Sequence, residues 1–472
     1  MSKLINRRDA LKTMAVSGVG VALGGSALNS CKSSTKTSPA VVRTTGGGEM
    51  TSRYWESLGD TVSSLGLGCM RFPTVEGSRN VIDQAQVNDM VDYALAHGIN
   101  YFDTAPYYSD GQSEICLGNA IRKHPRESFL LATKMSSHNF MEGGNEDMPA
   151  DEVYKKSVAL FEQSCQRLYT DYFDYYLLHC IGTGTGMPFF ERRFIESGVL
   201  DFLVEKRNKG VIRHLGFSFH GDYRVFDHLM SLHDTVHWDF VQIQMNYLDW
   251  TYNTRKGTTD NAKYLYDELQ KRNIPVVVME PIRGGALANV NDGLRAKMAE
   301  IRPELSPAGL ALDYVASHTG VLTTLSGMSN MDQLVENINT FSPLNTLSEA
   351  EQNLMETEIA RLYGENPTIG CTACDYCMPC PYGIDIPGNL RIYDACTSQL
   401  LLPNPNGEHD KEFFRKRRIF LNRYKNTLDE KKRSEFCINC KQCIPKCPQG
   451  INIPNRLQRI EDLVAKLKDI NE

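Results

Sequence analysis

The chain has 472 residues, beyond the length at which one hydrophobic core keeps growing, so we expect two folded domains. A hydrophobic content of 41% is typical of a globular protein. The net charge of -6 is small for this length, and the composition therefore gives no sign of a nucleic-acid partner.

The N-terminal residues have the layout of a signal peptide. Arg7 and Arg8 precede a glycine-rich apolar run over residues 14–28. This run is too short and too rich in glycine for a stable membrane-spanning helix. The segment resembles a twin-arginine export signal, which serves proteins that fold and bind their cofactors before export. We therefore expect a periplasmic protein.

Cys31 stands at the end of this segment, after Leu28-Asn29-Ser30. The arrangement is similar to a lipobox, in which the chain is cut before a cysteine that then carries lipid. A lipid on Cys31 would make the protein a membrane-anchored lipoprotein with a flexible tether. An ordinary cleavage site with an incidental cysteine explains the same residues, so the sequence leaves the lipid anchor open.

Residues 58–342 alternate short β-branched or aromatic runs with longer amphipathic stretches, which is typical of repeated βα units. Eight strands are predicted, at 64–70, 99–103, 129–134, 173–179, 212–218, 240–246, 275–280 and 321–327. Helical periodicity is found between them, at 87–97, 150–168, 259–272 and 307–317. The α/β pattern therefore predicts a closed (β/α)8 TIM barrel, with its chemistry at the carboxyl ends of the strands.

The composition changes after Gly364, where cysteine and proline become dense. A basic segment, residues 413–433, separates two cysteine arrays. The predicted organisation is a signal peptide at 1–31, a linker at 32–56, the barrel at 57–345, a connecting helix or linker at 346–365, an iron-sulfur domain at 366–460 and a helical tail at 461–472.

Four residues at the predicted strand ends suit the reduction of a carbonyl group: Asp103, Tyr108, Lys134 and His179. A tyrosine with a pKa of about 10 can donate a proton to the carbonyl oxygen but is a weak acid. The ammonium of Lys134, held by Asp103, would stabilise the phenolate of Tyr108. His179 would donate a hydrogen bond that orients the carbonyl. Singly, each residue also has an ordinary structural explanation; together they indicate catalysis.

In this order, the four residues resemble the Asp-Tyr-Lys-His tetrad of the aldo-keto reductases. The resemblance covers residues 57–340 and implies hydride transfer between a nicotinamide cofactor and a carbonyl or alcohol substrate. Further matches are Gly111-Gln112-Ser113-Glu114, Leu117-Gly118, Leu215-Gly216-Phe217-Ser218 and Glu336-Asn337. The substrate loops carry no recognisable chemistry, and a sugar or other polyol is our expectation.

The resemblance also implies where the cofactor, NADP or NAD, would bind. By family position, Ser218 and Gln242 would hydrogen-bond the carboxamide, whereas Glu336 and Asn337 would meet the adenine end. Arg283, in the loop after the seventh strand, could reach a cofactor phosphate or could be a solvated loop arginine.

The sequence departs from the family pattern in three places. Phe219 replaces the usual asparagine, and Met279 replaces the aromatic ring that stacks on the nicotinamide. Residues 327–333 contain no basic side chain for a 2'-phosphate, which favours arginine. A preference for NADP over NAD is therefore not implied.

The two cysteine arrays have the spacing of iron-sulfur ligands. Three closely spaced cysteines of such a run face one cluster and the fourth reaches another. This predicts two 4Fe-4S clusters, the first with Cys371, Cys374, Cys377 and Cys447, and the second with Cys437, Cys440, Cys443 and Cys380. The first array is one residue shorter before its last cysteine, which makes its cluster less typical. Disulfides or zinc are the alternatives, and the spacing fits both less well.

The spacer between the arrays is too long for a minimal ferredoxin and has helical periodicity, so the C-terminal domain resembles the helical two-cluster ferredoxins. Its basic residues either dock an acidic electron-transfer partner or offset the negative charge of the clusters.

We expect an exported oxidoreductase in which the barrel moves hydride and the clusters exchange single electrons with a partner. Hydride carries two electrons, so this link needs a mediator or a sequential transfer. One alternative makes the clusters structural. Another is a redox-sensing or binding module whose barrel does not turn over.

Overall fold

The computed structural model describes residues 49–76, 81–141, 147–251, 261–365, 368–447 and 449–470, together with the backbone of the short strand β1 (Val41–Arg43). The predicted signal peptide at 1–31, Cys31 and much of the predicted linker lie outside the described residues. Within the described residues, no helix is both long and apolar enough to cross a membrane.

Eight parallel strands close into a barrel in the order β10-β11-β4-β5-β6-β7-β8-β9. Each predicted strand is present, and the (β/α)8 prediction is confirmed. The strands are β4 (Leu65–Gly68), β5 (Tyr101–Asp103), β6 (Leu130–Met135), β7 (Phe173–Ile181), β8 (Ile212–Phe219), β9 (Phe240–Gln244), β10 (Val276–Met279) and β11 (Val321–Ser326).

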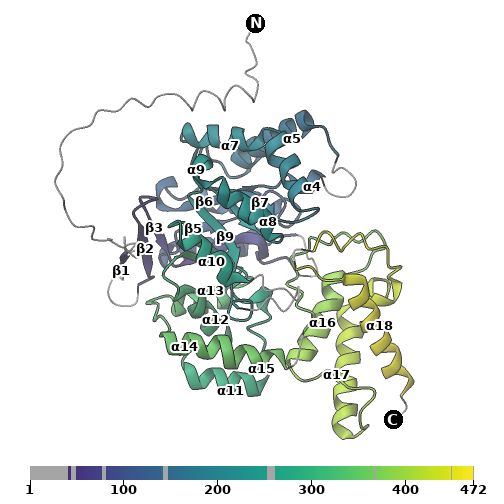
Figure 1. The fold of residues 1–472 in the computed structure, drawn as a ribbon. Coiled ribbons are helices and arrows are strands. Elements are labelled where there is room, and N and C mark those ends of the chain that lie inside the picture. The colour runs from purple at the N-terminus through teal and green to yellow at the C-terminus, as the bar shows by residue number, and fades with distance from the viewer. Residues whose placement is uncertain are drawn as a thin grey trace, which may run out of the picture. The chain divides into compact units, whose positions relative to one another are not determined.

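Helices surround the barrel strands (Figure 1). The longer ones are α2 (Gln84–Ala96), α3 (Gln112–Ile121), α5 (Ala150–Arg167), α7 (Val199–Asn208), α8 (Tyr223–Ser231), α10 (Ala262–Gln270), α11 (Asp292–Ile301), α12 (Pro307–Ala316) and α13 (Met331–Thr340). Side-chain caps define several starts. The Asp83 carboxylate accepts hydrogen bonds from the first turn of α2, and the Ser306 hydroxyl accepts one from Gly309 in α12. Pro307 at the first position of α12 fixes the helical φ there.

A hairpin of β2 (Ser52–Trp55) and β3 (Asp60–Ser63) closes the amino-terminal end of the barrel. Leu58 and Val62 pack into the apolar cluster that fills the barrel interior, with Tyr101, Tyr175 and Leu177 among its members. Arg53 is buried and donates hydrogen bonds to the carbonyls of Ala316 and Val321. Because this end is plugged, a ligand can reach the barrel centre only from the carboxyl ends of the strands.

After the barrel strands, α14 (Glu349–Leu354) and α15 (Ala360–Gly364), joined by the π-helical turn Met355–Ile359, still pack on the barrel core through Met355, Ile359 and Tyr363. The buried residues from Ile384 onward form a second hydrophobic core. Helices α16 (Ile386–Ser398), α17 (Lys411–Thr427) and α18 (Ile453–Asp469) then pack side by side (Figure 1). Phe420 and Ile460 are fully buried between them, and the cysteine loops lie against the same core. Contacts between this region and the barrel keep both in one compact unit.

Candidate active site

The four predicted catalytic residues converge at the carboxyl end of the barrel. Lys134 Nζ, in β6, lies 2.6 Å from Asp103 Oδ1 at the end of β5 and 2.7 Å from the carbonyl oxygen of Thr104. The same ammonium lies 5.0 Å from the centre of the Tyr108 ring. The Tyr108 ring is 5.9 Å from the imidazole of His179 in β7. The topology therefore brings together residues from three neighbouring strands.

Burial controls the protonation states of these catalytic side chains. The side chains of Lys134 and Asp103 are 1% and 5% exposed, so their ion pair is shielded from water. Burial raises the pKa of Tyr108 well above its usual value, and the charge of Asp103 adds to the shift. The sequence led us to expect that Lys134 would favour the phenolate, but in the closed site burial has the larger effect. Tyr108 therefore holds its proton firmly at neutral pH.

His179 is neutral in this site because burial lowers its pKa well below the usual value, with the nearby His138 adding to the effect. Its Nδ1 lies 2.6 Å from Ser136 Oγ. When Ser136 donates to Nδ1, Nε2 carries the ring proton and can donate to an oxygen in the site. Arg193, which is 1% exposed, donates to the carbonyls of His179 and Cys180 and so fixes the end of β7.

Tyr376 is a further residue of this site, and sequence reasoning missed it. It stands between Cys374 and Cys377 in the first cysteine array, yet its hydroxyl lies 3.1 Å from His179 Nε2. A hydrogen bond with Tyr376 also offsets part of the rise in the pKa of Tyr108. Tyr376 thus contacts the two side chains expected to bind a substrate carbonyl. The one signal in the sequence is its position inside the cysteine array, and that position suggests a role near the clusters rather than in the barrel site.

His138 is the second residue that the sequence did not indicate. Its ring lies 4.9 Å from the ring of His179, and neither of its nitrogens has a hydrogen-bond partner in the described part of the chain. His138, His179 and Cys180 each offer a metal-ligand atom within 4.8 Å of the others. The charges of Arg193 and Lys134 act on these two histidines and oppose a cation there, so the trio is better suited to bind polar ligand groups.

The residues expected to hold the nicotinamide carboxamide, Ser218 and Gln242, lie on β8 and β9 and are 0% and 2% exposed. Ser218 Oγ accepts a hydrogen bond from the backbone nitrogen of Cys180 at 3.2 Å. Gln242 Oε1 is buried and accepts no hydrogen bond from any described residue. A buried amide oxygen without a donor is costly, and a carboxamide NH2 would satisfy it. The residues present therefore fit a nicotinamide.

The other three predicted cofactor residues are placed differently. Arg283 is 3% exposed and its Nε lies 3.2 Å from Asp249 Oδ2, so the reading as a solvated loop arginine is wrong. Asn337 is buried and donates to Ser326 Oγ at 2.9 Å, at the end of β11. Glu336 is exposed and accepts a hydrogen bond from Ser306 at the start of α12. Among the described residues, no hydrogen bond or ion pair joins these three residues to Ser218 or Gln242, and their roles at the adenine end and at a phosphate stay predictions.

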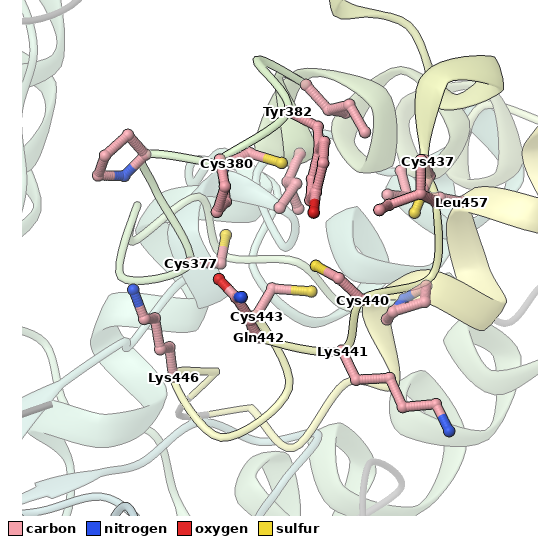
Figure 2. Close-up of a pocket in the computed structure, with 16 residues that line it drawn as sticks. Cys377, Cys380, Tyr382, Cys437, Cys440, Lys441, Gln442, Cys443, Lys446 and Leu457 are labelled. Atoms are coloured by element: carbon pink, nitrogen blue, oxygen red, sulfur yellow. The ribbon is translucent and has the colours of Figure 1, made fainter. Parts of the chain in front are cut away.

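The eight cysteines of the arrays line two cavities, and each cavity takes cysteines from both arrays. The first is lined by Cys371, Cys374, Cys377 and Cys447. The second is lined by Cys380, Cys437, Cys440 and Cys443, and Cys377 lines it as well. Figure 2 shows the thiols of Cys380, Cys440 and Cys443 directed into the second cavity. These are the two crossed sets that the spacing predicts.

The thiols of each set also influence one another. Burial raises the pKa of Cys374 to about 12, and the charge of Cys447 adds to the rise. Burial likewise raises the pKa of Cys443 to about 11, with contributions from Cys437, Cys440 and Cys380. Across the described residues, no disulfide bond joins the cysteines. Four such thiols can all ionise only when cations lie among them.

The profile of the Aldo/keto reductase family matches residues 64–357, which is more than half of the chain. A barrel with this tetrad defines a class of oxidoreductase, and the chain belongs to the aldo/keto reductase family. The match ends before Cys371, the first cysteine of the arrays.

Individual relatives cover the barrel region. Protein tas of Escherichia coli strain K12 is 29% identical over an alignment of 318 residues that covers 59% of this chain and 89% of tas. The NADH-specific methylglyoxal reductase of the same strain is 27% identical over an alignment of 319 residues that covers 62% of this chain and 94% of the reductase. Among solved structures, aldo-keto reductase AKR11C1 from Bacillus halodurans has 25% identity and a TM-score of 0.49, and the match covers 66% of this chain and 96% of that one.

Replacing Asp103 with alanine leaves the Lys134 ammonium buried without a carboxylate. We expect Asp103→Ala to lower the free energy of unfolding by about 3 to 5 kcal/mol, the cost of breaking a buried pair. Denaturant unfolding followed by circular dichroism measures this change. Glu205→Ala is the control, because its partner Lys209 is 62% exposed, and we expect no measurable change. Equal changes in the free energy of unfolding of the two variants would show that the buried pair stabilises the fold no more than the exposed pair does.

Proposed function

We propose that this oxidoreductase interconverts a small-molecule carbonyl and the corresponding alcohol with NADP or NAD as its hydride carrier. The observation that carries the proposal is the convergence of Tyr108, the buried Lys134–Asp103 pair and His179 at the open end of the barrel. Membership of the aldo/keto reductase family supports it. A relative named as an NADH-specific reductase shows that NAD chemistry occurs among similar proteins.

The nicotinamide, when bound, supplies or accepts the hydride. Ser218 and Gln242 would hold its carboxamide, which sets the orientation of the ring. His179 Nε2 donates a hydrogen bond to the carbonyl oxygen and positions it beside Tyr108. As negative charge develops on that oxygen, Tyr108 transfers its proton to it. Carbonyl, hydride and proton together give the alcohol.

Lys134 acts on the state that follows proton transfer. Tyr108 becomes a phenolate, and its ring centre is 5.0 Å from the Lys134 ammonium. A cation at this distance in a buried site stabilises the phenolate. Asp103 keeps the ammonium aimed, because its Oδ1 is 2.6 Å from Lys134 Nζ. The pair therefore lowers the cost of the proton transfer that burial would otherwise oppose.

Tyr108→Phe removes the proton donor without changing the size of the ring. We expect kcat for aldehyde reduction to fall by about 10²- to 10⁴-fold, as for other losses of general acid catalysis. Steady-state assays with NADH and NADPH measure this. Tyr107→Phe is the matched control, because Tyr107 is the exposed neighbour, and its activity should stay normal. Loss of activity in Tyr107→Phe with normal activity in Tyr108→Phe would reverse the assignment.

We further propose that the two cysteine cavities hold two 4Fe-4S clusters. The support is chemical: the eight cysteines with iron-sulfur spacing line the two cavities, Cys377 lining both, and their neighbouring thiols can ionise together only around cations. Cys371, Cys374, Cys377 and Cys447 would hold one cluster, and Cys380, Cys437, Cys440 and Cys443 the other. Since each cluster carries single electrons, electron exchange with a partner would require the two electrons of hydride to be split.

Iron content tests the crossed ligand sets. The anaerobically purified chain should contain about eight irons, and Cys371→Ser with Cys447→Ser should lose about four, because both belong to one cluster. Uncrossed ligation would instead remove both clusters in this double variant. Cys396→Ser is the control, since Cys396 is buried in the same core but lines neither cavity. Iron near zero in the unchanged protein would contradict the cluster proposal.

One observation favours a second candidate, a redox-sensing protein. The Tyr376 hydroxyl lies 3.1 Å from His179 Nε2, where a substrate oxygen would bind. Since Tyr376 stands between two cysteines of one cavity, the state of a cluster there would decide whether the site is open. In this alternative the barrel binds a cofactor without turnover, and the clusters regulate a partner.

Tyr376→Phe separates the candidates. The variant keeps the ring but loses a hydroxyl that competes with substrate for His179, so we expect the KM for aldehyde to fall by about 2- to 10-fold with kcat unchanged. Tyr382→Phe is the control, because Tyr382 lines the second cysteine cavity instead. A fall in kcat would show that Tyr376 takes part in proton transfer. Absence of turnover in every form of the protein would favour the sensor.

Export is also part of the proposal. It rests on the twin-arginine pattern at Arg7 and Arg8 and on the fit between that route and a protein that binds cofactors before export. Cys31 would attach the exported protein to a membrane if it carries lipid.

A further inference from the structure

A cleft of about 1070 Å³ lies between the barrel mouth and the C-terminal region. On the barrel side, the cleft is lined by Tyr108, in the loop after β5, and by His179, in β7. From the C-terminal region it is lined by the cysteine loop that carries Tyr376 and by residues of α16 and α17. A substrate whose carbonyl reaches Tyr108 therefore extends into a space with walls from both parts of the protein.

The cleft carries an excess of positive charge. Arg71, Arg391, Arg423 and Lys446 line it, against the carboxylates of Asp110 and Asp375. Arg391 and Lys446 form no hydrogen bond or ion pair with any described residue. Arg423 donates to Gln399 Oε1 at 2.8 Å and retains further N–H groups. Cationic groups without protein partners in a cleft are available to bind an anion.

Compensation of the negative charge of the proposed clusters explains some of these four cationic residues. Lys446 also lines the second cysteine cavity, so its charge has a use there. Arg391, on α16, and Arg423, on α17, line neither cysteine cavity but do line the cleft. Their placement needs another reason, and an arginine guanidinium is the side chain best shaped to bind a carboxylate or phosphate in two-point fashion.

We propose that the substrate is an anionic carbonyl compound, with a carboxylate or phosphate that binds Arg391 and Arg423 while its carbonyl meets Tyr108 and His179. This inference rests on the proposed carbonyl reductase function and deepens it by naming the substrate class. The C-terminal region then supplies the charged wall of the substrate site. Family membership of the barrel does not provide this wall, because both arginines lie beyond residue 357, where the family match ends.

Matched substrate pairs test the proposal on the full chain, purified anaerobically with its clusters. One pair is 4-carboxybenzaldehyde and its methyl ester, and the other is glyceraldehyde 3-phosphate and glyceraldehyde. We expect kcat/KM for the charged member of at least one pair to exceed that of the neutral member by about tenfold, the effect of one charge-assisted contact. Which pair shows the difference identifies carboxylate or phosphate as the anion.

Two variants assign the effect to the arginines. Arg391→Gln and Arg423→Gln should each lower kcat/KM for the preferred anion by about three- to tenfold and leave the neutral member within about twofold. Lys425→Gln is the control, because Lys425 is an exposed cation on the same helix as Arg423 but does not line the cleft. Salt at about 1 M should reduce the preference, since it screens charges at exposed sites.

The outcomes separate this proposal from the function on which it rests. If neither member of any pair is reduced, the carbonyl reductase function fails. If charged and neutral members are reduced equally well, that function stands and the anionic substrate is overturned. A change in the KM of NADH or NADPH, with the aldehyde preference unaltered in the arginine variants, would assign the charges to the cofactor and would also overturn it.

Discussion

The hydrogen bond between the Tyr376 hydroxyl and His179 Nε2, 3.1 Å long, is the contact on which the relation between the two parts of this protein depends. Tyr376 belongs to a loop whose cysteines on either side, Cys374 and Cys377, line one cavity. A movement of this loop would therefore displace the hydroxyl from His179. Conversely, an occupant that fixes the cysteines also fixes the tyrosine. The barrel site and the first cysteine cavity therefore share one loop, so that a conformational change at one site alters the free energy of the other.

The parts of the structure that follow from local patterns were predictable. Several barrel strands are short β-branched or aromatic runs, so their places are set by neighbouring residues; β10 at Val276–Met279, for example, lies inside the predicted 275–280. Asp103 and Lys134 end or nearly end their strands, and a closed parallel barrel brings such positions together. The 2.6 Å contact between Lys134 and Asp103 thus follows from their positions at the ends of neighbouring strands, which the sequence pattern predicts.

Long-range packing was not predictable. Tyr376 and His179 are 197 residues apart, and no periodicity or motif relates them. Arg283 illustrates the same limit, since an arginine in a glycine-rich loop suggests a solvated side chain. Instead it is 3% exposed and paired with Asp249, while Gly284 beside it packs against Thr372 of the cysteine loop. The crossed grouping of the cysteines could be predicted because it depends on the ligand spacing within each array. The packing of the C-terminal region on the barrel could not, because it depends on how the surfaces of the two regions fit together.

The same packing bears on how a cofactor reaches the barrel. Ser218 and Gln242 are polar yet almost inaccessible, at 0% and 2% exposure, so a nicotinamide can bind them only after covering groups move. At the mouth, a Cβ on Gly284 would lie 2.5 Å from the Thr372 carbonyl oxygen, and Arg71 donates a hydrogen bond to that same oxygen. These contacts tie the loop after β10 and the loop after β4 to the cysteine loop. A ligand that binds the open mouth must therefore offset the loss of these contacts, and anything that loosens the cysteine loop raises its apparent affinity.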